Sequence, residues 1–120
     1  EDNELEYLDT PIPICADESF HNYDDIENIF KRYEYINIKL DKTGGLTEGL
    51  KIAKRAKELE KGIMIGCMVG SSLSMLPALM LYKYANYIDL DGPCFLKKDE
   101  DDGLIYDEGL IKLPKQVCWG

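Results

Sequence analysis

Short, mainly apolar runs alternate with amphipathic stretches along most of the chain. The apolar runs lie at residues 11–16, 35–40, 63–68 and 87–90. Between them, apolar residues recur at spacings of three and four, the pattern of a helix with one buried face. The helices predicted from this pattern cover residues 24–33, 46–61 and 72–84.

Residue types with defined conformational preferences mark the predicted helix boundaries. Asp24 and Thr47 are predicted N-caps, because their side-chain oxygens can accept hydrogen bonds from the first free N–H groups of a helix. Gly62 is predicted to end the second helix. Pro77 lacks an N–H, so we expect it near the first turn of the third helix, which then starts at Ser72 or Ser74.

The order of these elements predicts an α/β fold. Strands separated by helices run parallel, and each crossover is expected to be right-handed. Parallel strands are usually buried on both faces, which agrees with their continuous apolar character. Two architectures fit equally well at this level, a doubly wound open sheet and part of a (β/α) barrel.

The flanks of this repeating region differ from its centre. Residues 3–9 resemble the last turns of a preceding helix. After Asp91 the pattern weakens, and the charged run 97–103 is predicted to be a solvated loop. The short runs 104–106 and 110–113 are predicted to form a small closing ribbon. We therefore divide the chain into a barrel portion, residues 1–93, and a C-terminal segment, residues 94–120.

The uncharged stretch Gly62 to Tyr82 is long enough to raise the question of a membrane span. Glycine, serine and proline residues interrupt it, so it reads better as a strand, a turn and a helix. The 120 residues carry 23 acidic and 14 basic side chains, a formal net charge of −9. This excess of acidic residues argues against binding to nucleic acid or to an anionic membrane surface.

The four cysteines are scattered over the chain, and no C-x-x-C motif or neighbouring histidine accompanies them. This spacing argues against a zinc site and predicts four buried free thiols in a reducing compartment. The acidic first residues do not resemble a secretory signal. We therefore expect a cytoplasmic protein.

In either architecture, ligands bind at the carboxyl ends of the strands. Asp17 closes the first predicted strand and is a candidate Mg²⁺ ligand, or simply a turn residue. Lys39, inside an apolar strand, must be paired, point outward or act in function. Asp89 and Asp91 point the same way, so their charges repel unless a metal ion or an ammonium group lies between them. The candidates for substrate binding at the end of the third strand are Cys67, Met68 and Ser71.

Gly44 and Gly45 lie between a predicted strand and a predicted helix, where backbone N–H groups can bind phosphate. The rest of a P-loop or of a dinucleotide-binding motif is absent. A tight turn is therefore the favoured interpretation of this pair.

Four segments together resemble the enolase superfamily, in its muconate-lactonizing subgroup, and within it the dipeptide epimerases. They are residues 13–19 (PICADES), 37–45 (NIKLDKTGG), 66–68 (GCM) and 89–93 (DLDGP). The resemblance runs from about Asp9 to Pro114. The D-x-D of the last segment is the feature that points to the dipeptide epimerases.

The resemblance implies that this chain is the C-terminal half of a modified (β/α)7β barrel, about strands five to eight, with a C-terminal segment. It also implies an Mg²⁺-dependent isomerase that removes and returns the α-proton of a dipeptide through an enediolate. Asp17 would be one of three metal ligands and Lys39 one of two acid/base lysines. Asp89 and Asp91 would hold the ammonium group of the dipeptide.

The resemblance leaves open other activities of the same superfamily, the identity of the dipeptide, and an inactive fragment. A muconate cycloisomerase or an o-succinylbenzoate synthase is disfavoured by the D-x-D, since neither substrate carries an α-ammonium group. Gly70 replaces a Glu that is common in the family, which leaves the identity of the dipeptide open. By itself the segment is predicted to be an inactive half barrel that associates with other copies, as a homo-oligomer.

Overall fold

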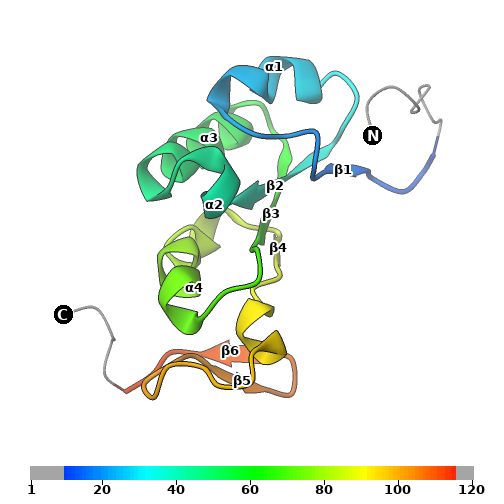
Figure 1. Ribbon diagram of the computed structural model, residues 1–120. Coiled ribbons are helices and arrows are strands. Elements are labelled where there is room, and N and C mark those ends of the chain that lie inside the picture. Colours follow the sequence, from blue (N-terminus) through cyan, green and yellow to red (C-terminus); the bar gives the residue numbers. More distant parts are fainter. Residues whose placement is uncertain (1–9, 116–120) are drawn as a thin grey trace.

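The computed structural model describes residues 10–115 (Figure 1). Its centre is a parallel sheet of four strands in the order β1-β2-β3-β4. The strands are β1 (Cys15–Ala16), β2 (Tyr35–Lys39), β3 (Gly62–Gly66) and β4 (Tyr87–Ile88). All neighbouring pairs are parallel, as the alternation of strands and helices predicted.

Helices follow each of the first three strands. The α-helices are α1 (Ile26–Ile29), α2 (Leu40–Thr43), α3 (Leu46–Glu58) and α4 (Ser72–Leu79). Three 3₁₀ turns accompany them, η1 (Tyr23–Asp25), η2 (Tyr82–Tyr84) and η3 (Gly92–Phe95). In Figure 1, α2, α3 and α4 lie on the same side of the sheet. This one-sided cover is typical of part of a barrel and excludes a doubly wound sheet for the described residues.

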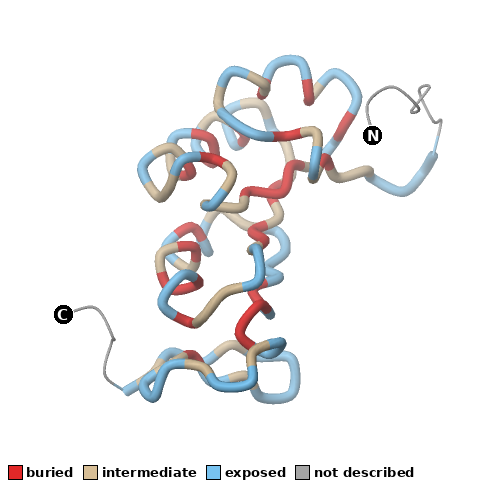
Figure 2. Tube along the Cα trace, in the orientation of Figure 1, coloured by how far each residue is buried: buried red, intermediate tan, exposed pale blue. Residues whose placement is uncertain are grey.

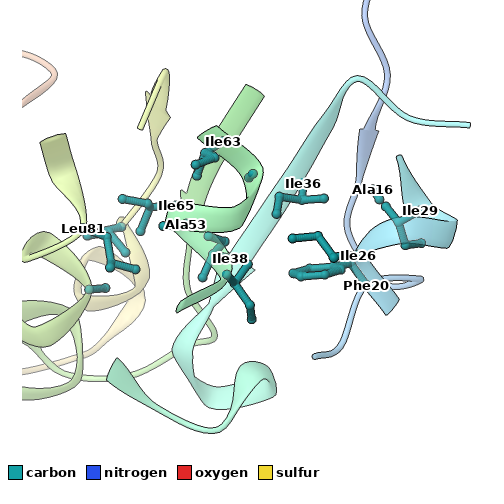
Figure 3. Packing of buried hydrophobic residues seen from close by; sticks show 14 of the residues in the cluster. Ala16, Phe20, Ile26, Ile29, Ile36, Ile38, Ala53, Ile63, Ile65 and Leu81 are labelled. Atoms are coloured by element: carbon teal, nitrogen blue, oxygen red, sulfur yellow. The ribbon is translucent and has the colours of Figure 1, made fainter. Parts of the chain in front are cut away.

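The alternation of side chains along β2 separates a buried face from an open one. Ile36 and Ile38 are fully buried against the helices, together with Ile63 and Ile65 of β3 (Figure 3). Each buried isoleucine contributes about 1.5–3 kcal/mol relative to an exposed one. Figure 2 shows buried residues along β2 and β3 and in α3 and α4. Asn37 and Lys39, which alternate with Ile36 and Ile38 along β2, face the other way.

The helix predicted over residues 24–33 is the 3₁₀ turn η1 followed by the short helix α1, which begins at Ile26 and ends at Ile29. Asn22 is the N-cap of η1: its side chain accepts a hydrogen bond from Asp24 N at 2.9 Å, so Asp24 is not the N-cap. The carboxylate of Asp25 accepts from Asn22 N at 3.1 Å and completes a capping box. The α-helix then ends at Ile29, because residues 30–33 turn back toward β2.

The turn Gly44–Gly45 joins two helices. Thr47 is not the N-cap of α3: Leu40–Thr43 form the unpredicted helix α2, and Gly45 caps α3. Both glycines have positive φ, +90° and +92°, a region that side chains with a Cβ rarely enter. The pair is therefore a tight turn, as favoured from the sequence.

Two further boundaries were predicted wrongly. Helix α3 ends at Glu58, and Gly62 begins β3, where a Cβ would lie 2.1 Å from the Tyr35 ring. Pro77 is the sixth residue of α4 and lies outside its first turn. The start of α4 is fixed by a distant group, because Asp99 accepts hydrogen bonds from Ser72 N, at 2.8 Å, and from Ser72 Oγ.

The C-terminal ribbon is confirmed as β5 (Ile105–Asp107) paired antiparallel with β6 (Leu110–Lys112). The Tyr106 hydroxyl donates a hydrogen bond to Leu90 O and ties the ribbon to the end of β4. The charged run 97–103 is only partly solvated, because Asp99 is engaged by α4. The helix expected over residues 3–9 lies outside the described residues.

The uncharged stretch 62–82 folds as a strand, a loop and a helix, as predicted. Within residues 10–115, no helix combines the length and apolar character that crossing a membrane requires. Cys15, Cys67 and Cys94 form no disulfide, but only the first two are half-buried; Cys94 is exposed, which corrects the expectation of uniformly buried thiols. Cys118 lies outside the described residues.

Candidate functional site

Residues from all four parallel strands line one open cavity of about 280 Å³ at the carboxyl end of the sheet. Five of the seven predicted site residues meet there: Asp17, Lys39, Cys67, Asp89 and Asp91. The strand register explains this convergence. Lys39 pairs with Gly66 across β2 and β3, and Asp89 directly follows Ile88, which pairs with Ile65 of β3. Neighbouring strands therefore end at similar heights and bring their closing residues together.

Asp17 and Lys39 form an ion pair at one end of this cavity. Lys39 Nζ lies 2.8 Å from Asp17 Oδ1 and donates to Oδ2 at 2.9 Å. Lys42, from α2, donates to Asp17 Oδ1 at 3.1 Å and to the Asp17 backbone carbonyl at 2.7 Å. Two ammonium groups thus fix one carboxylate, and this pairing explains a charged residue inside an apolar strand.

The ion pair moves both pKa values in the direction that favours charge. Burial alone would raise the pKa of Asp17, but the hydrogen bonds from Lys39 and Lys42 outweigh it and hold that pKa below its ordinary value. Burial likewise lowers the pKa of Lys39, and the hydrogen bond and charge of Asp17 raise it above its ordinary value. In this arrangement Lys39 therefore holds a proton.

Asp89 and Asp91 line the same cavity but, unlike Asp17, form no ion pair with a described residue. Both residues are exposed, and no hydrogen bond or ion pair reaches either carboxylate from within residues 10–115. Lys98, a basic residue of the loop that follows, pairs instead with Asp101 at 3.0 Å. The two like charges are therefore open to a cationic ligand.

Cys67 lies half-buried in the cavity, against the start of η3. Burial raises the pKa of its thiol; the N–H of Gly92 lowers it, and the charges of Asp91 and Asp89 raise it further. A Cβ on Gly92 would lie 2.8 Å from Met68 O and 3.3 Å from Cys67 Sγ, so this close packing requires glycine. Cys67 is thus a neutral lining residue.

Met68 and Ser71 are not brought into this cavity. Met68 is about half exposed beyond the end of β3, and Ser71 is the N-cap of α4, where its carbonyl accepts from Ser74 Oγ at 2.8 Å. Their proposed contacts with a substrate stay predictions.

Two residues of the cluster were not among the predicted site residues. Lys42 follows Lys39 by three residues, within α2, and both ammonium groups reach Asp17. Asn37 lines the cavity from β2. It lies two residues before Lys39, so strand periodicity places both on one face, a signal that could have been used.

Asp17 is a hard oxygen donor of the kind Mg²⁺ prefers. Within residues 10–115, however, no three Asp, Glu, His or Cys side chains come close enough together to hold a metal ion. The described residues therefore provide one potential ligand and not a complete metal site.

A parallel sheet covered by helices on one face, with a lysine and carboxylates at the ends of its strands, has the form of part of a (β/α) barrel. Residues 2–120 match the family model described as enolase C-terminal domain-like, and the chain belongs to this family.

Individual relatives of the chain are racemases and epimerases. It is 48% identical over 121 residues to an N-acetyl-D-glutamate racemase from Pseudoalteromonas sp., and it spans 38% of that protein. It is 42% identical over 113 residues to the L-Ala-D/L-Glu epimerase of Escherichia coli (strain K12), covering 94% of this chain and 35% of the relative.

A solved structure supports the same grouping. An enolase family member from Agrobacterium tumefaciens, described as homologous to dipeptide epimerases and bound to sodium and L-Ala-L-Glu, superposes with a TM-score of 0.85 at 46% identity. The match covers 90% of this chain and 33% of that one. The chain thus spans about a third of the length of these relatives, and the fold expectation of a partial barrel is confirmed.

Proposed function

We propose that this chain supplies the C-terminal part of the barrel of a dipeptide epimerase. The observation that supports this most strongly is the cavity that the paired Lys39 and Asp17 share with the carboxylates of Asp89 and Asp91, which have no partner among residues 10–115. Such an arrangement can bind a substrate that carries both a carboxylate and an ammonium group. A dipeptide with a free N-terminus is one.

Each residue has a distinct part in the proposed reaction. Lys39 moves a proton to or from the α-carbon of the substrate, and Asp89 and Asp91 hold the ammonium group through charge-assisted hydrogen bonds. Cys67, as a neutral thiol, shapes the wall of the cavity. Asp17 would hold Mg²⁺ together with ligands from outside the described residues. When bound, Mg²⁺ supplies positive charge that stabilises negative charge developing on the substrate carboxylate.

Lys39 must lose its proton to act as a base, and its pairing with Asp17 opposes this. Engaging the Asp17 carboxylate with a cation would remove the interaction that raises the pKa of Lys39. Lys42, which also binds the Asp17 backbone carbonyl, would keep that residue in place. The cluster is thus suited to an exchange of partners at Asp17.

The test is a hybrid enzyme in which residues 1–120 replace the matching segment of the Escherichia coli epimerase. The hybrid should exchange the α-proton of the Glu residue of L-Ala-L-Glu in deuterated water, observed by NMR. The Lys39→Ala hybrid should not, and neither should the isolated 120 residues. A folded hybrid without exchange contradicts the proposal.

A second candidate is an N-acyl amino acid racemase, favoured by the 48% identity to the Pseudoalteromonas protein. Its substrates carry no α-ammonium group, so Asp89 and Asp91 would have no ligand to bind. The open state of these carboxylates is why we prefer the dipeptide. Comparing free with N-acetylated L-Ala-L-Glu separates the two activities.

We also propose that residues 1–93 form the barrel portion, and that 94–120 close against it. The separate ribbon and its tie through Tyr106 support this division.

Copies of the isolated chain should associate. Next to β4 lies an apolar groove of about 620 Å³ lined by α4 and the ribbon, and an uncovered groove of this kind favours self-association. Light scattering from a stable monomer at tens of micromolar would contradict this.

A further inference from the structure

Asn37 is a buried polar side chain with an unmet hydrogen-bonding group. It is 4% exposed, and its Oδ1 has no hydrogen-bond partner among residues 10–115. Buried side-chain oxygens in folded proteins are nearly always paired, because leaving one unpaired is costly. Asn37 Oδ1 can therefore accept a hydrogen bond from a donor outside the described residues, and a ligand in the adjoining cavity is one such donor.

The strands around Asn37 are built to admit its carboxamide. Asn37 lines the cavity beside Lys39 and Asp17. On the neighbouring strand, a Cβ on Gly66 would lie 2.4 Å from Asn37 Oδ1 and 2.7 Å from Nδ2. Any larger residue at position 66 would displace the amide, so glycine there keeps a polar group in place within a buried strand.

The chemistry of the cavity narrows what Asn37 can bind. A substrate carboxylate offers only acceptors and cannot satisfy Oδ1, while an ammonium group is better matched by Asp89 and Asp91. A secondary amide offers an N–H that can donate to Asn37 Oδ1, which is the hydrogen bond that this buried oxygen lacks among residues 10–115.

We propose that Asn37 is a substrate-binding residue whose carboxamide pairs with the amide on the α-nitrogen of the substrate. This rests on the proposed function. It also accounts for a feature shared by the relatives, since an L-Ala-Glu dipeptide and N-acetylglutamate both carry an acyl group on the α-nitrogen of glutamate. Asp89 and Asp91 would then distinguish between acyl groups, while Asn37 recognises the amide common to both.

The test compares L-Ala-L-Glu with its ester analogue, in which oxygen replaces the peptide N–H, in the wild-type hybrid and in Asn37→Ala. For each substrate the quantity is the variant-to-wild-type ratio of kcat/KM for α-proton exchange, so differences in intrinsic reactivity cancel. Asn37→Ala should lower kcat/KM for the amide by about 10–100-fold and change the ester by less than about threefold.

Asn86→Ala is the matched control. Asn86 Oδ1 accepts from Ile63 N at 3.0 Å, and Asn86 does not line the cavity. We expect Asn86→Ala to lower the Tm and to leave the preference for amide over ester unchanged. We expect Asn37→Ala to leave the Tm unchanged and to lower the preference for amide over ester. Equal losses on both substrates for Asn37→Ala, or a fall in Tm with the preference intact, would overturn the proposal.

Equilibrium binding gives the same comparison without turnover when both hybrids also carry Lys39→Ala. Titration calorimetry of L-Ala-L-Glu and of its ester should show that Asn37→Ala weakens binding of the amide selectively. An inactive wild-type hybrid contradicts the proposed function, whereas equal affinities of both proteins for the amide contradict the role of Asn37.

Discussion

Asp17 and the pair Asp89 and Asp91 line the same cavity at the carboxyl end of the sheet, but they differ in whether basic side chains neutralise their charges. Asp17 is held by Lys39 and Lys42, at distances of 2.7–3.1 Å. Asp89 and Asp91 have no such partner among the described residues. The described residues thus fix the Asp17 carboxylate themselves, whereas the carboxylates of Asp89 and Asp91 are free to bind a cationic ligand.

Under the proposed function, this difference separates a group that acts on the reacting atoms from groups that select the substrate. Lys39, already held by Asp17, would be positioned before the substrate arrives, as proton transfer requires. Two unpaired like charges repel each other, and binding a cation relieves that repulsion. Changes at the two ends should therefore have different effects, the first on all substrates and the second on charged ones only.

The largest effect is expected at the paired end. Lys39→Ala in the hybrid should lower kcat for α-proton exchange by about 10²–10⁴-fold, because it removes a positioned acid/base group. The loss should be the same for free and N-acetylated dipeptides. Lys51→Ala is the control: Lys51 pairs with Glu48 of α3 and lies over the Tyr23 ring, and it does not line the cavity, so its loss should leave kcat unchanged. Near wild-type exchange by Lys39→Ala would refute the assignment.

A smaller effect is expected from the residue that holds Asp17 in place. Lys42→Met should lower kcat/KM on the order of 10-fold, since a charge-assisted hydrogen bond contributes about 1.5–3 kcal/mol. It should also raise the Mg²⁺ concentration needed for half-maximal activity. Lys61→Met, which removes a lysine bound to Tyr33 O away from the cavity, is the control. An unchanged Mg²⁺ dependence in Lys42→Met would show that Lys42 does not position Asp17.

The smallest effect concerns stability away from the cavity. Asp99→Ala removes the cap of α4, and such losses cost about 0.5–2 kcal/mol. Burial alone would raise the pKa of Asp99, but hydrogen bonds from Ser72 outweigh it and hold that pKa below its ordinary value. The contribution of Asp99 is therefore complete above the ordinary Asp pKa and is lost as pH falls through the lower, folded-state pKa.

Thermal unfolding of the hybrid between pH 3 and pH 7 measures this contribution. The difference in Tm between wild type and Asp99→Ala should be constant near neutral pH and should shrink at the acidic end. Asp101→Ala, at an exposed pair with Lys98, is the control and should change the Tm little. A Tm difference that does not depend on pH would argue against an ionised Asp99 cap.

The sequence was informative wherever local periodicity and register decide the structure. The alternation of helices and strands predicts parallel pairing, and parallel pairing brings Asp17, Lys39 and Asp89 together at the carboxyl ends of the strands. These residues could be predicted because strand ends converge in any parallel sheet.

Features that depend on distant partners could not be predicted in this way. The start of α4 is set by Asp99, 27 residues further along, which is why the position of Pro77 was misjudged. The helix α2 consists of one turn between a strand and a glycine pair, too short for a periodic pattern. Strand periodicity could have placed Asn37 on the same face as Lys39. That its Oδ1 has no hydrogen-bond partner among residues 10–115 could not be predicted, because this depends on the packing around Gly66.

The most direct test of the account is whether Asp91 recognises a charge on the substrate. The measurement is kcat/KM of the wild-type and Asp91→Asn hybrids for L-Ala-L-Glu and for its N-acetylated form. The account predicts that Asp91→Asn loses about 10–100-fold on the free dipeptide and little on the acetylated one. An equal loss on both would contradict it, because Asp89 and Asp91 would then support the barrel and not select the substrate.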